Sequence, residues 1–598
     1  MFKAGLVALA LAVTPVGWPY YGGDQGGSHF STLVDINRAN VSRLTVAWQW
    51  KTGERALPQF GTRPGAFEAT PLMFGDVLYV VTPYNRVVAL DADTGHERWS
   101  FDPKAYEDGQ PPNGTGFVHR GLAAWGDGHR LRLFLNSRYR LFCLDAQTGT
   151  LVETFGDRGS VDLSRGLVWA INKKHYTNTS PPVVYKDLVI LGNGVGDRLA
   201  YKNDPPGDVR AFDARTGKQV WTFHTIPQPG EFGNDTWKND SWAFTGHTNV
   251  WAPMTLDESR GLLYLPVSTP SNDFYGARRP GQNLFADSIV CLDAATGVRK
   301  WHYQLVHHGL WDYDNPSPPS LVTITVDGRS IDAVVQLTKQ GFAFVFDRVT
   351  GAPVWPIEER PVPASDVAGE QAWPTQPFPT RPPALTEQGV TLDDAINDAA
   401  REELKKYRIG PVFTPPSLRG TVQRPGIIGG ANWGGAAFDP TSALLFVKTT
   451  NQANIVRLGK PDRSAANPRA DEVDADLVRS GDTAAEFDNG TQLLKGPYGH
   501  VVAVDLNHGT IRWRVPFPAP GAPGVMATAS GLVFVGGGDT ALHALDAGTG
   551  AELWRGALGR RSTATPMTFR SGSGRQMVVI ASGGGEDAAL AAFAVPGK

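Results

Sequence analysis

One eleven-residue phrase recurs along the chain and constrains its fold more than any other feature. Each copy reads as a strand that ends in Asp, a Thr-Gly turn, and a second strand that leads to Trp. In such a turn the glycine supplies a positive φ, and the Asp and Thr side chains bond backbone amides. Copies occupy residues 89–99, 211–221, 291–301, 345–355, 503–513 and 544–554, and a seventh, at residues 143–155, lacks the Trp.

Apolar runs of strand type precede the copies, at residues 77–81, 188–191, 262–265 and 532–535. A hairpin with further strands before it is the unit of a β-propeller. The interval from Asp347 to Asp505 is roughly twice the usual one, and residues 434–448 supply one degenerate unit inside it. The sequence therefore predicts an all-β chain, an eight-bladed β-propeller of four-stranded antiparallel blades with tryptophan-docking motifs.

Residues 18–598 are expected to form this single propeller. The early strand at residues 44–50 should join the last blade and close the ring, which removes an exposed sheet edge. Each repeated Trp should wedge between neighbouring blades, because an indole has a large apolar area to bury. Insertions are expected near residues 373–426, with a helical piece at 392–407, and near 461–496, which is polar and loop-like. Both should cover one face.

Charge and targeting signals limit the function. Lys and Arg total 56 against 59 Asp and Glu, with no basic block of the kind that tracks a phosphate backbone, so nucleic acid is not an expected partner. A charged start followed by the apolar residues 4–13 predicts a signal peptide over residues 1–17 and a periplasmic or secreted protein. No later segment approaches the ~20 apolar residues of a membrane span.

Two cysteines, Cys143 and Cys291, stand at the same position of separate repeat copies. We therefore expect buried free thiols on different blades instead of a disulfide. The sequence has no C-x-x-C-H motif, so it encodes no covalently attached c-type haem.

The repeated phrase resembles the tryptophan-docking motif of the alcohol and glucose dehydrogenases that depend on pyrroloquinoline quinone (PQQ). The resemblance extends from W-P-Y-Y-G-G-D-Q-G-G at residues 18–27 to A-T-P-M-T-F at residues 564–569. It is closest to the propeller part of the membrane-type glucose dehydrogenases. It implies a dehydrogenase that oxidises a sugar or an alcohol.

The stretch H-H-G-L-W-D-Y-D-N-P at residues 307–316 gains a meaning from this resemblance. By position, Asp312 corresponds to the family aspartate that acts as general base on the substrate hydroxyl. Lys339, in Q-L-T-K-Q-G, matches the Lys or Arg that contacts the quinone oxygens and stabilises charge on the reduced cofactor. For His307 and His308 we expect a structural or supporting role.

Further residues match the cofactor site of the family. Trp251, in T-N-V-W-A-P, corresponds to the tryptophan floor on which the flat cofactor stacks. Arg120, in H-R-G-L-A, corresponds to an arginine that pairs with a cofactor carboxylate. The remaining candidate cofactor contacts are His119, Thr179, Asn432 and Trp433.

The metal shell departs from the family pattern of Glu, Asn and the catalytic Asp. Asp197 replaces the Glu region and Thr269 stands at the Asn position, while Asp312 and Asp314 complete the candidate set. Asn272 or Asp273 is an alternative ligand. Calcium tolerates hydroxyl, carbonyl and carboxylate oxygens, so we expect Ca²⁺, with Mg²⁺ or a lanthanide left open. Asp314 does not select among them, because glucose-type and lanthanide-using members both carry this carboxylate.

Val118-His119 stands where many relatives carry two adjacent cysteines, and glucose-type members also lack that cysteine pair. The resemblance therefore favours sugars over small alcohols. It implies that the substrate hydroxyl loses its proton to Asp312 while hydride passes to PQQ, with the metal as Lewis acid. Electrons must then reach a separate carrier, either a cytochrome c or a membrane quinone reached through a partner protein.

Two other functions are compatible with a propeller fold. A non-catalytic propeller scaffold of the outer-membrane assembly type shares the docking phrase, and fold alone does not exclude it. Such a scaffold has no reason to keep Asp312, Lys339, Trp251 and Arg120 together. A sugar-binding or hydrolytic propeller would need paired carboxylates that flank a glycosidic bond, whereas Asp312 and Asp314 alternate along one loop. The sequence does not predict the oligomeric state.

Overall fold

A computed structural model of the chain describes residues 16–128, 130–194, 196, 201–467, 470–517, 519–521 and 523–597. Within these residues the chain is built from sheets whose strands pair antiparallel except for β1 with β31, and α1 (Asp398–Leu404) is the one α-helix. Apart from Val16 and Gly17, the predicted signal peptide lies outside the described residues.

Most sheets take their strands in chain order, and each sheet follows the previous one along the chain. Four of them are β3–β6 (Leu72–Phe74, Val77–Val81, Val87–Asp91, Glu97–Phe101), β7–β10 (Ala123–Gly126, Leu131–Ser137, Arg140–Asp145, Ser160–Asp162), β11–β14 (Val183–Tyr185, Leu188–Leu191, Val209–Asp213, Gln219–Phe223) and β15–β18 (Thr255–Asp257, Leu262–Pro266, Ser288–Asp293, Arg299–Gln304). The propeller fold predicted from the repeats is confirmed as a set of such sheets.

The second half of the chain continues the pattern. Its sheets are β19–β21 (Ser320–Val326, Arg329–Leu337, Ala343–Asp347), β25, β26, β29 and β30 (Ala436–Asp439, Leu444–Thr450, Gly499–Asp505, Thr510–Pro516), β31–β34 (Val525–Thr528, Leu532–Gly536, Ala541–Asp546, Glu552–Ala557) with β1 (Phe30–Ser31) on its edge, and β35–β37 (Met567–Arg570, Gln576–Ser582, Ala589–Ala594) with β2 (Thr45–Lys51). Two further sheets are formed by segments that connect the strands above. They are β22–β23 (Ile357–Pro361, Thr375–Pro379), between β21 and β25, and a sheet of β24 (Thr421–Gln423), which precedes β25, with β27 and β28 (Asn454–Gly459, Val478–Ala484), which lie between β26 and β29.

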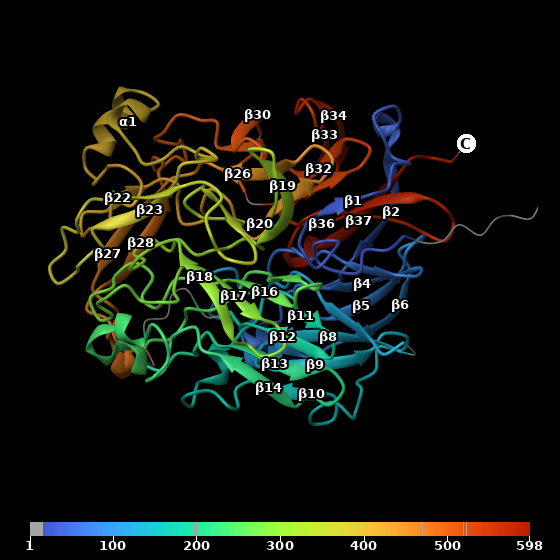
Figure 1. Ribbon diagram of the computed structural model, residues 1–598, viewed down its shortest axis with the longest axis horizontal. Coiled ribbons are helices and arrows are strands. Elements are labelled where there is room, and N and C mark those ends of the chain that lie inside the picture. The colour runs from blue at the N-terminus through green and yellow to red at the C-terminus, as the bar shows by residue number, and fades with distance from the viewer. Residues whose placement is uncertain are drawn as a thin grey trace, which may run out of the picture.

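The two ends of the chain meet in one sheet. Strand β2 pairs antiparallel with β37, from Thr45 opposite Ala594 to Lys51 opposite Ala589. Figure 1 shows blue β2 beside red β37. The pairing confirms the prediction for the early strand, and it covers an edge of the last sheet that would otherwise present unpaired backbone groups.

The repeated Trp side chains dock onto the turn of the next sheet. The indole nitrogen of Trp99 donates to the Ala146 carbonyl at 3.2 Å, and a Cβ on Gly149 would lie 2.4 Å from the Trp99 ring. The turn glycine is thus required both for its φ of +73° and for the close approach of the ring. The same bond joins Trp48, Trp221, Trp301, Trp513 and Trp554 to the carbonyls of Ala92, Ala294, Arg348, Ala547 and Leu44. The predicted wedge role is confirmed.

One junction lacks this wedge. Glu153 stands where the other copies have Trp. The glycine of the next turn, Gly217, instead lies against Gly156 and Val161, with its ideal Cβ 2.8 Å from Val161 Cγ2. A groove lined partly by Glu153 and Gly217 remains at this junction.

Removing one docking indole should destabilise the fold strongly. Trp221 is 8% exposed and bonds Ala294. We expect Trp221→Ala to lose about 3–5 kcal/mol of stability from the cavity and the lost bond. The matched change Val220→Ala, at a neighbour that is 52% exposed, should cost less than about 0.5 kcal/mol. Thermal unfolding of both variants checks this, and equal midpoints would contradict the docking account.

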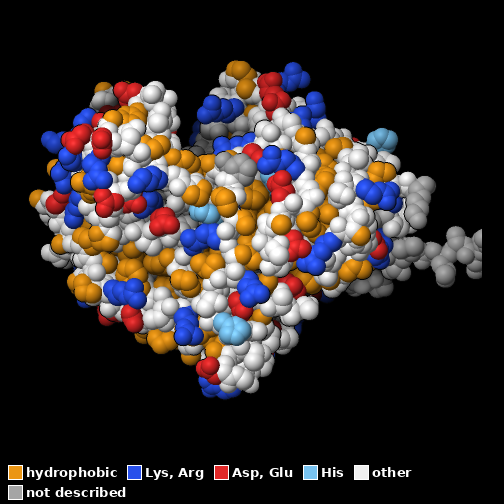
Figure 2. Space-filling view, turned by 90° about the horizontal axis from the view of Figure 1, so that it is seen from above, with side chains coloured by type: hydrophobic (Ala, Val, Ile, Leu, Met, Phe, Trp, Pro, Cys, Tyr) orange, Lys and Arg blue, Asp and Glu red, His pale blue; other side chains and the backbone are white. Residues whose placement is uncertain are grey.

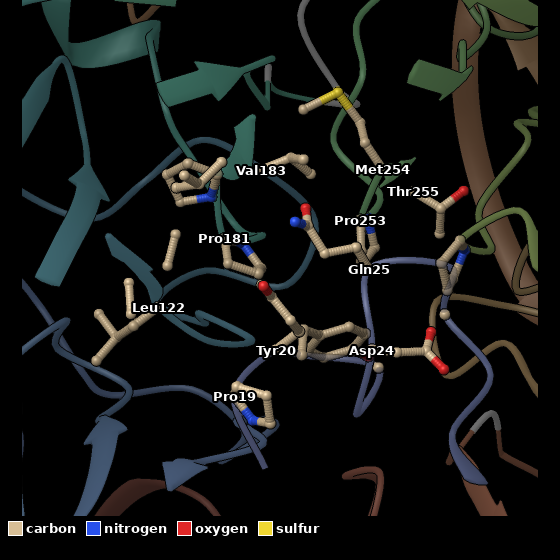
Figure 3. Close-up of a pocket in the computed structure, with 18 residues that line it drawn as sticks. Pro19, Tyr20, Asp24, Gln25, Leu122, Pro181, Val183, Pro253, Met254 and Thr255 are labelled. Atoms are coloured by element: carbon tan, nitrogen blue, oxygen red, sulfur yellow. The ribbon is translucent and has the colours of Figure 1, made fainter. Parts of the chain in front are cut away.

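The segment at residues 16–31 crosses the inner strands of the sheets. Backbone bonds join residues 25–29 to Leu256, Leu321, Phe438 and Ala527, in four successive sheets. In Figure 3, Tyr20, Asp24 and Gln25 of this segment share a small pocket with Pro181 and Met254. None of the predicted site residues lines this pocket.

The remaining predictions on local structure have mixed outcomes. Cys143 on β9 and Cys291 on β17 are buried free thiols, as predicted. The predicted helical piece at 392–407 contains the short 3₁₀ helix η7 (Leu392–Asp394) and α1, which the Asn397 side chain caps by accepting from the Ala400 amide. The stretch near 461–496, predicted as loop, contains strand β28, whose backbone pairs with β27. The sequence of β28 is polar and lacks the apolar alternation typical of a strand. The strand forms through its pairing with β27, so the sequence alone did not predict it.

No helix among the described residues is long and apolar enough to span a membrane. On the face in Figure 2, basic and acidic side chains are interspersed, consistent with the small net charge of −3.

Candidate active site

Most predicted site residues lie on the loops that lead into the innermost strands. Arg120 precedes β7, Thr179 precedes β11, Trp251 precedes β15, Asp312 and Asp314 precede β19, and Trp433 precedes β25. Thr269 and Lys339 lie just after β16 and β20, the strands that return to the same end. Inner strands of a propeller surround its axis, so residues far apart in sequence converge at one end of it.

Lys339 joins the two aspartates of the 307–316 loop. Its Nζ donates to Asp312 Oδ1 at 2.9 Å and to Asp314 Oδ2 at 3.0 Å. Burial opposes the charge on Lys339, but both carboxylates raise its pKa above the ordinary lysine value. Burial also raises the pKa of Asp314, yet Lys339 and the Thr269 amide outweigh it and hold that pKa below its usual range. The cluster is therefore a buried cation between two carboxylates.

Two aromatic residues alternate in sequence with the two aspartates of this loop. Trp311 and Tyr313 alternate with them and point into the insertion, where the Trp311 indole donates to Thr414 O at 3.0 Å and the Tyr313 hydroxyl donates to Pro425 O at 2.7 Å. Both aromatic side chains are fully buried, at 0% and 1% exposure. The carboxylates of Asp312 and Asp314 instead both reach Lys339.

A stack of flat side chains borders the carboxylates. The Trp251 indole donates to Asp314 Oδ2 at 3.2 Å. The Arg120 guanidinium carbon lies 5.2 Å from the centre of the Trp251 ring and 4.7 Å from that of Trp433, within the range of cation–π contacts. Arg120 is 2% exposed and pairs with Glu68 at 3.0 Å. Two indoles and a guanidinium thus form one apolar and cationic wall, in which Arg120 and Trp433 are buried and Trp251 is partly buried.

The other candidate cofactor residues, Thr179, His119 and Asn432, bond to the backbone near this wall. The Thr179 hydroxyl donates to the Trp251 carbonyl at 3.2 Å. The ring of His119 is occupied by Asn136 and by the Gly121 amide, and burial lowers the pKa of His119 to about 4. The side chain of Asn432 bonds the Ile428 carbonyl and the Trp433 amide, so it shapes the turn that carries Trp433.

The candidate metal ligands are only partly gathered. The Thr269 amide donates to Asp314 Oδ1, and its hydroxyl donates to Asp287 Oδ1, both at 2.8 Å. Asp197 lies outside the described residues. The Asn272 side chain donates to Leu477 O, and the Asp273 carbonyl accepts from the Asp312 amide. The described residues contain no group of three His, Cys, Asp or Glu side chains spaced to hold a metal ion.

Two acidic residues of this region were missed by sequence reasoning. Glu68 is the buried partner of Arg120, and burial raises its pKa although Arg120 opposes the shift. A signal existed, because Glu68 stands three residues before Pro71, the offset of Asn178 before Pro181 at another inner strand. Asp287 bonds Thr269 and is fully buried, and its pKa lies well above the ordinary value because of burial and Asp314. Nothing in its sequence context marks Asp287.

The assembled residues fit a planar, conjugated ligand that carries carboxylates. The indoles offer flat apolar surfaces, and Arg120 Nε is buried with no hydrogen-bond partner, so the guanidinium keeps a donor for a further acceptor. For a metal ion, oxygens of Asp312, Asp314 and Thr269 are at hand, but Lys339 already bonds both carboxylates. The described donors alone therefore do not form a complete metal shell.

Comparison with known proteins gives consistent matches. The model of the PQQ family described as glucose/ethanol/alcohol dehydrogenase, β-propeller domain, matches residues 18–578. Quinoprotein glucose dehydrogenase of Escherichia coli K12 is 32% identical, over 96% of this chain and 78% of that protein. Quinate/shikimate dehydrogenase (quinone) of Acinetobacter baylyi is also 32% identical, over 97% of this chain and 78% of that protein.

Solved structures agree on the fold. The quinohemoprotein alcohol dehydrogenase of Comamonas testosteroni has a TM-score of 0.73 and 25% identity, over 98% of this chain and 82% of that one. A europium-containing methanol dehydrogenase has a TM-score of 0.71 and 24% identity, over 97% of this chain and 98% of that one. The likeness therefore extends over nearly the whole chain.

Proposed function

Because the chain belongs to the PQQ-dependent glucose/ethanol/alcohol dehydrogenase β-propeller family, we propose that it oxidises the hydroxyl of a sugar, such as a glucose-like aldose, or of an alcohol. The observation that carries the proposal is the buried cluster in which Lys339 bonds Asp312 and Asp314 beside Trp251. A non-catalytic scaffold would have no use for such a cluster, since unsatisfied or buried charges cost stability.

The wall of Trp251, Arg120 and Trp433 would hold the cofactor, with Thr179 behind it and His119 and Asn432 at its edges. When bound, PQQ supplies the hydride acceptor, and a divalent ion, preferably Ca²⁺ with Mg²⁺ or a lanthanide as alternatives, supplies Lewis-acid polarisation. Thr269, Asp312 and Asp314 would offer oxygens to that ion.

The chain's own part in the reaction is proton transfer and positioning. Asp312 accepts the proton of the substrate hydroxyl at its carboxylate, because loss of hydride from the adjacent carbon is easier as the oxygen becomes negative. Lys339 donates to Asp312 Oδ1 at 2.9 Å and so holds the carboxylate in place before the reaction. Asp314 supplies the second negative charge that keeps the buried Lys339 balanced and also fixes the Trp251 indole.

The wider context forms part of the proposal. The sheets would form eight blades of a closed ring, which the docking of each Trp on the next sheet and the β2–β37 pairing support. We place the protein in the periplasm or outside the cell on the strength of its N-terminal sequence. A cytochrome c or a quinone reached through a partner would take the electrons, because the sequence has no C-x-x-C-H haem motif.

A reconstitution assay tests the activity. Purified protein is loaded with PQQ and Ca²⁺, and reduction of an artificial dye is followed with glucose, other aldoses, quinate, glycerol and ethanol. We expect reduction with at least one sugar or alcohol and none without PQQ. Absence of reduction over the whole panel, together with no change in the PQQ absorbance on mixing, would instead favour the scaffold.

A further inference from the structure

The loop that carries Asp312 departs from the backbone conformations that side chains prefer. His308 has a φ of 47° and Asp312 a φ of 54°. This left-handed region is disfavoured for residues with a Cβ, and such residues persist where their surroundings over-determine the backbone. The contacts around residues 307–309 should therefore decide where Asp312 lies.

The first contact comes from Gln376 on β23. Its side-chain oxygen accepts from the His307 amide and its side-chain nitrogen donates to the His307 carbonyl, both at 2.8 Å. Gln376 is 0% exposed. One side chain thus satisfies both backbone groups of His307, as a neighbouring strand would.

The second contact comes from Glu370, in the connection between β22 and β23. Its Oε1 lies 3.0 Å from His308 Nε2, and the two side chains are 3% and 2% exposed. The other oxygen of Glu370 accepts from the Gly276 amide, and His308 Nδ1 lies 2.8 Å from the Gly281 carbonyl. Burial raises the pKa of Glu370, but His308, the Gly276 amide and the charge of Arg279 together outweigh it and leave that pKa below the ordinary value.

A third contact continues the series along the loop. Arg279, which is fully buried, donates to the Gly309 carbonyl at 2.6 Å and to the Asn272 carbonyl at 2.9 Å. Three consecutive loop residues are therefore each held by a buried polar side chain from another segment. Two of these side chains belong to the β22–β23 hairpin, which lies outside the predicted catalytic residues.

We propose that Glu370 and Gln376 are positioning residues. By fixing His307 and His308, the β22–β23 hairpin sets the loop so that the Asp312 carboxylate meets Lys339. The kinetic part of this inference rests on the proposed dehydrogenase function, whereas the structural part does not. Neither residue needs to touch the cofactor for this role.

Three variants in one hairpin test the role. Glu370→Ala removes the bond to His308, Gln376→Met removes both bonds to His307, and Glu358→Ala is the control, since Glu358 is 54% exposed and pairs with Arg360 on the same strand. Deuterium exchange of a peptide covering residues 305–314 is measured beside kcat, KM and PQQ affinity. Glu370→Gln serves as the rescue, because its amide oxygen can still accept from the Gly276 amide while its amide nitrogen donates to His308 Nε2.

For Glu370→Ala and Gln376→Met we expect about tenfold faster exchange in this peptide and a fall in kcat of about tenfold or more, because small misplacements of a reacting group cost that much. KM and PQQ affinity should change by less than about threefold, since the Trp251 wall is untouched. Glu358→Ala should match the wild type in every readout, and Glu370→Gln should come within about threefold of its kcat.

Folded variants with wild-type exchange and wild-type kcat would overturn the inference. Where a variant does not fold, deuterium exchange of residues 305–314 in the wild type tests the inference. A loop that Glu370 and Gln376 hold in place should exchange as slowly as the adjacent strands, and fast exchange would refute this role. If the wild type oxidises none of the substrates, the proposed function fails. The exchange data still test whether Glu370 and Gln376 position the loop.

Discussion

Asp312→Asn should reduce kcat by about 10²–10⁴-fold, the usual contribution of a positioned general base. The amide keeps the size and one acceptor oxygen of the carboxylate, but it does not take up a proton at neutral pH. Lys339 keeps its bond to Asp314, so the fold and the PQQ affinity should remain close to those of the wild type. Steady-state kinetics and calorimetric titration with PQQ measure the two effects separately.

The matched control for this change is Asp293→Asn. Asp293 is the turn aspartate of a docking repeat, where its carboxylate accepts from Thr296. Its replacement should cost some stability and leave kcat of the folded protein unchanged. A fully active Asp312→Asn variant would reject Asp312 as the base.

Lys339→Met should destabilise the protein by about 3–5 kcal/mol at neutral pH, because it leaves two buried carboxylates without their cation. It should also abolish PQQ-dependent turnover, since Asp312 loses the hydrogen bond that positions its carboxylate. The pH dependence of this loss of stability follows from Asp314, because Lys339 lowers the pKa of Asp314 in the folded protein. The stability from that depression is present above the unfolded pKa of Asp and is lost as pH falls through the folded pKa.

The difference in stability between wild type and Lys339→Met should therefore shrink as the pH is lowered into the acid range. Thermal unfolding from neutral pH downward measures this difference. Lys300→Met is the control, because Lys300 is 46% exposed and pairs with Asp293 at 3.3 Å, and such surface pairs contribute about 0–1 kcal/mol. Equal losses for both variants at neutral pH would contradict the buried-cluster account.

The repeats made much of the fold predictable. A strand, a turn with a required glycine, and a Trp at a constant offset are local features, and their recurrence implies that every copy packs in the same way. The docking of Trp99 on Gly149 and the β2–β37 closure follow from this rule. Strand β28 escaped prediction because its polar residues carry no apolar period and only pairing with β27 forms it.

The candidate site residues were predictable where they lie in short sequence motifs that resemble those of the family. The resemblance indicated Asp312, Lys339 and Trp251, and the structure brings the three together around Asp314. Glu370 and Gln376 were not indicated, because they act through contacts more than sixty residues away in sequence. Such partners are identified only from the structure, which places the β22–β23 hairpin in contact with the loop at residues 307–316.

We propose that PQQ would be held against Trp251 by Arg120, close to Asp312. A crystal structure of the protein grown with PQQ and Ca²⁺ tests it most directly. We expect planar density parallel to the Trp251 indole and within contact of Arg120, Lys339 and Asp312. Density for PQQ elsewhere on the molecule, with these side chains unchanged and water between them, would contradict the claim.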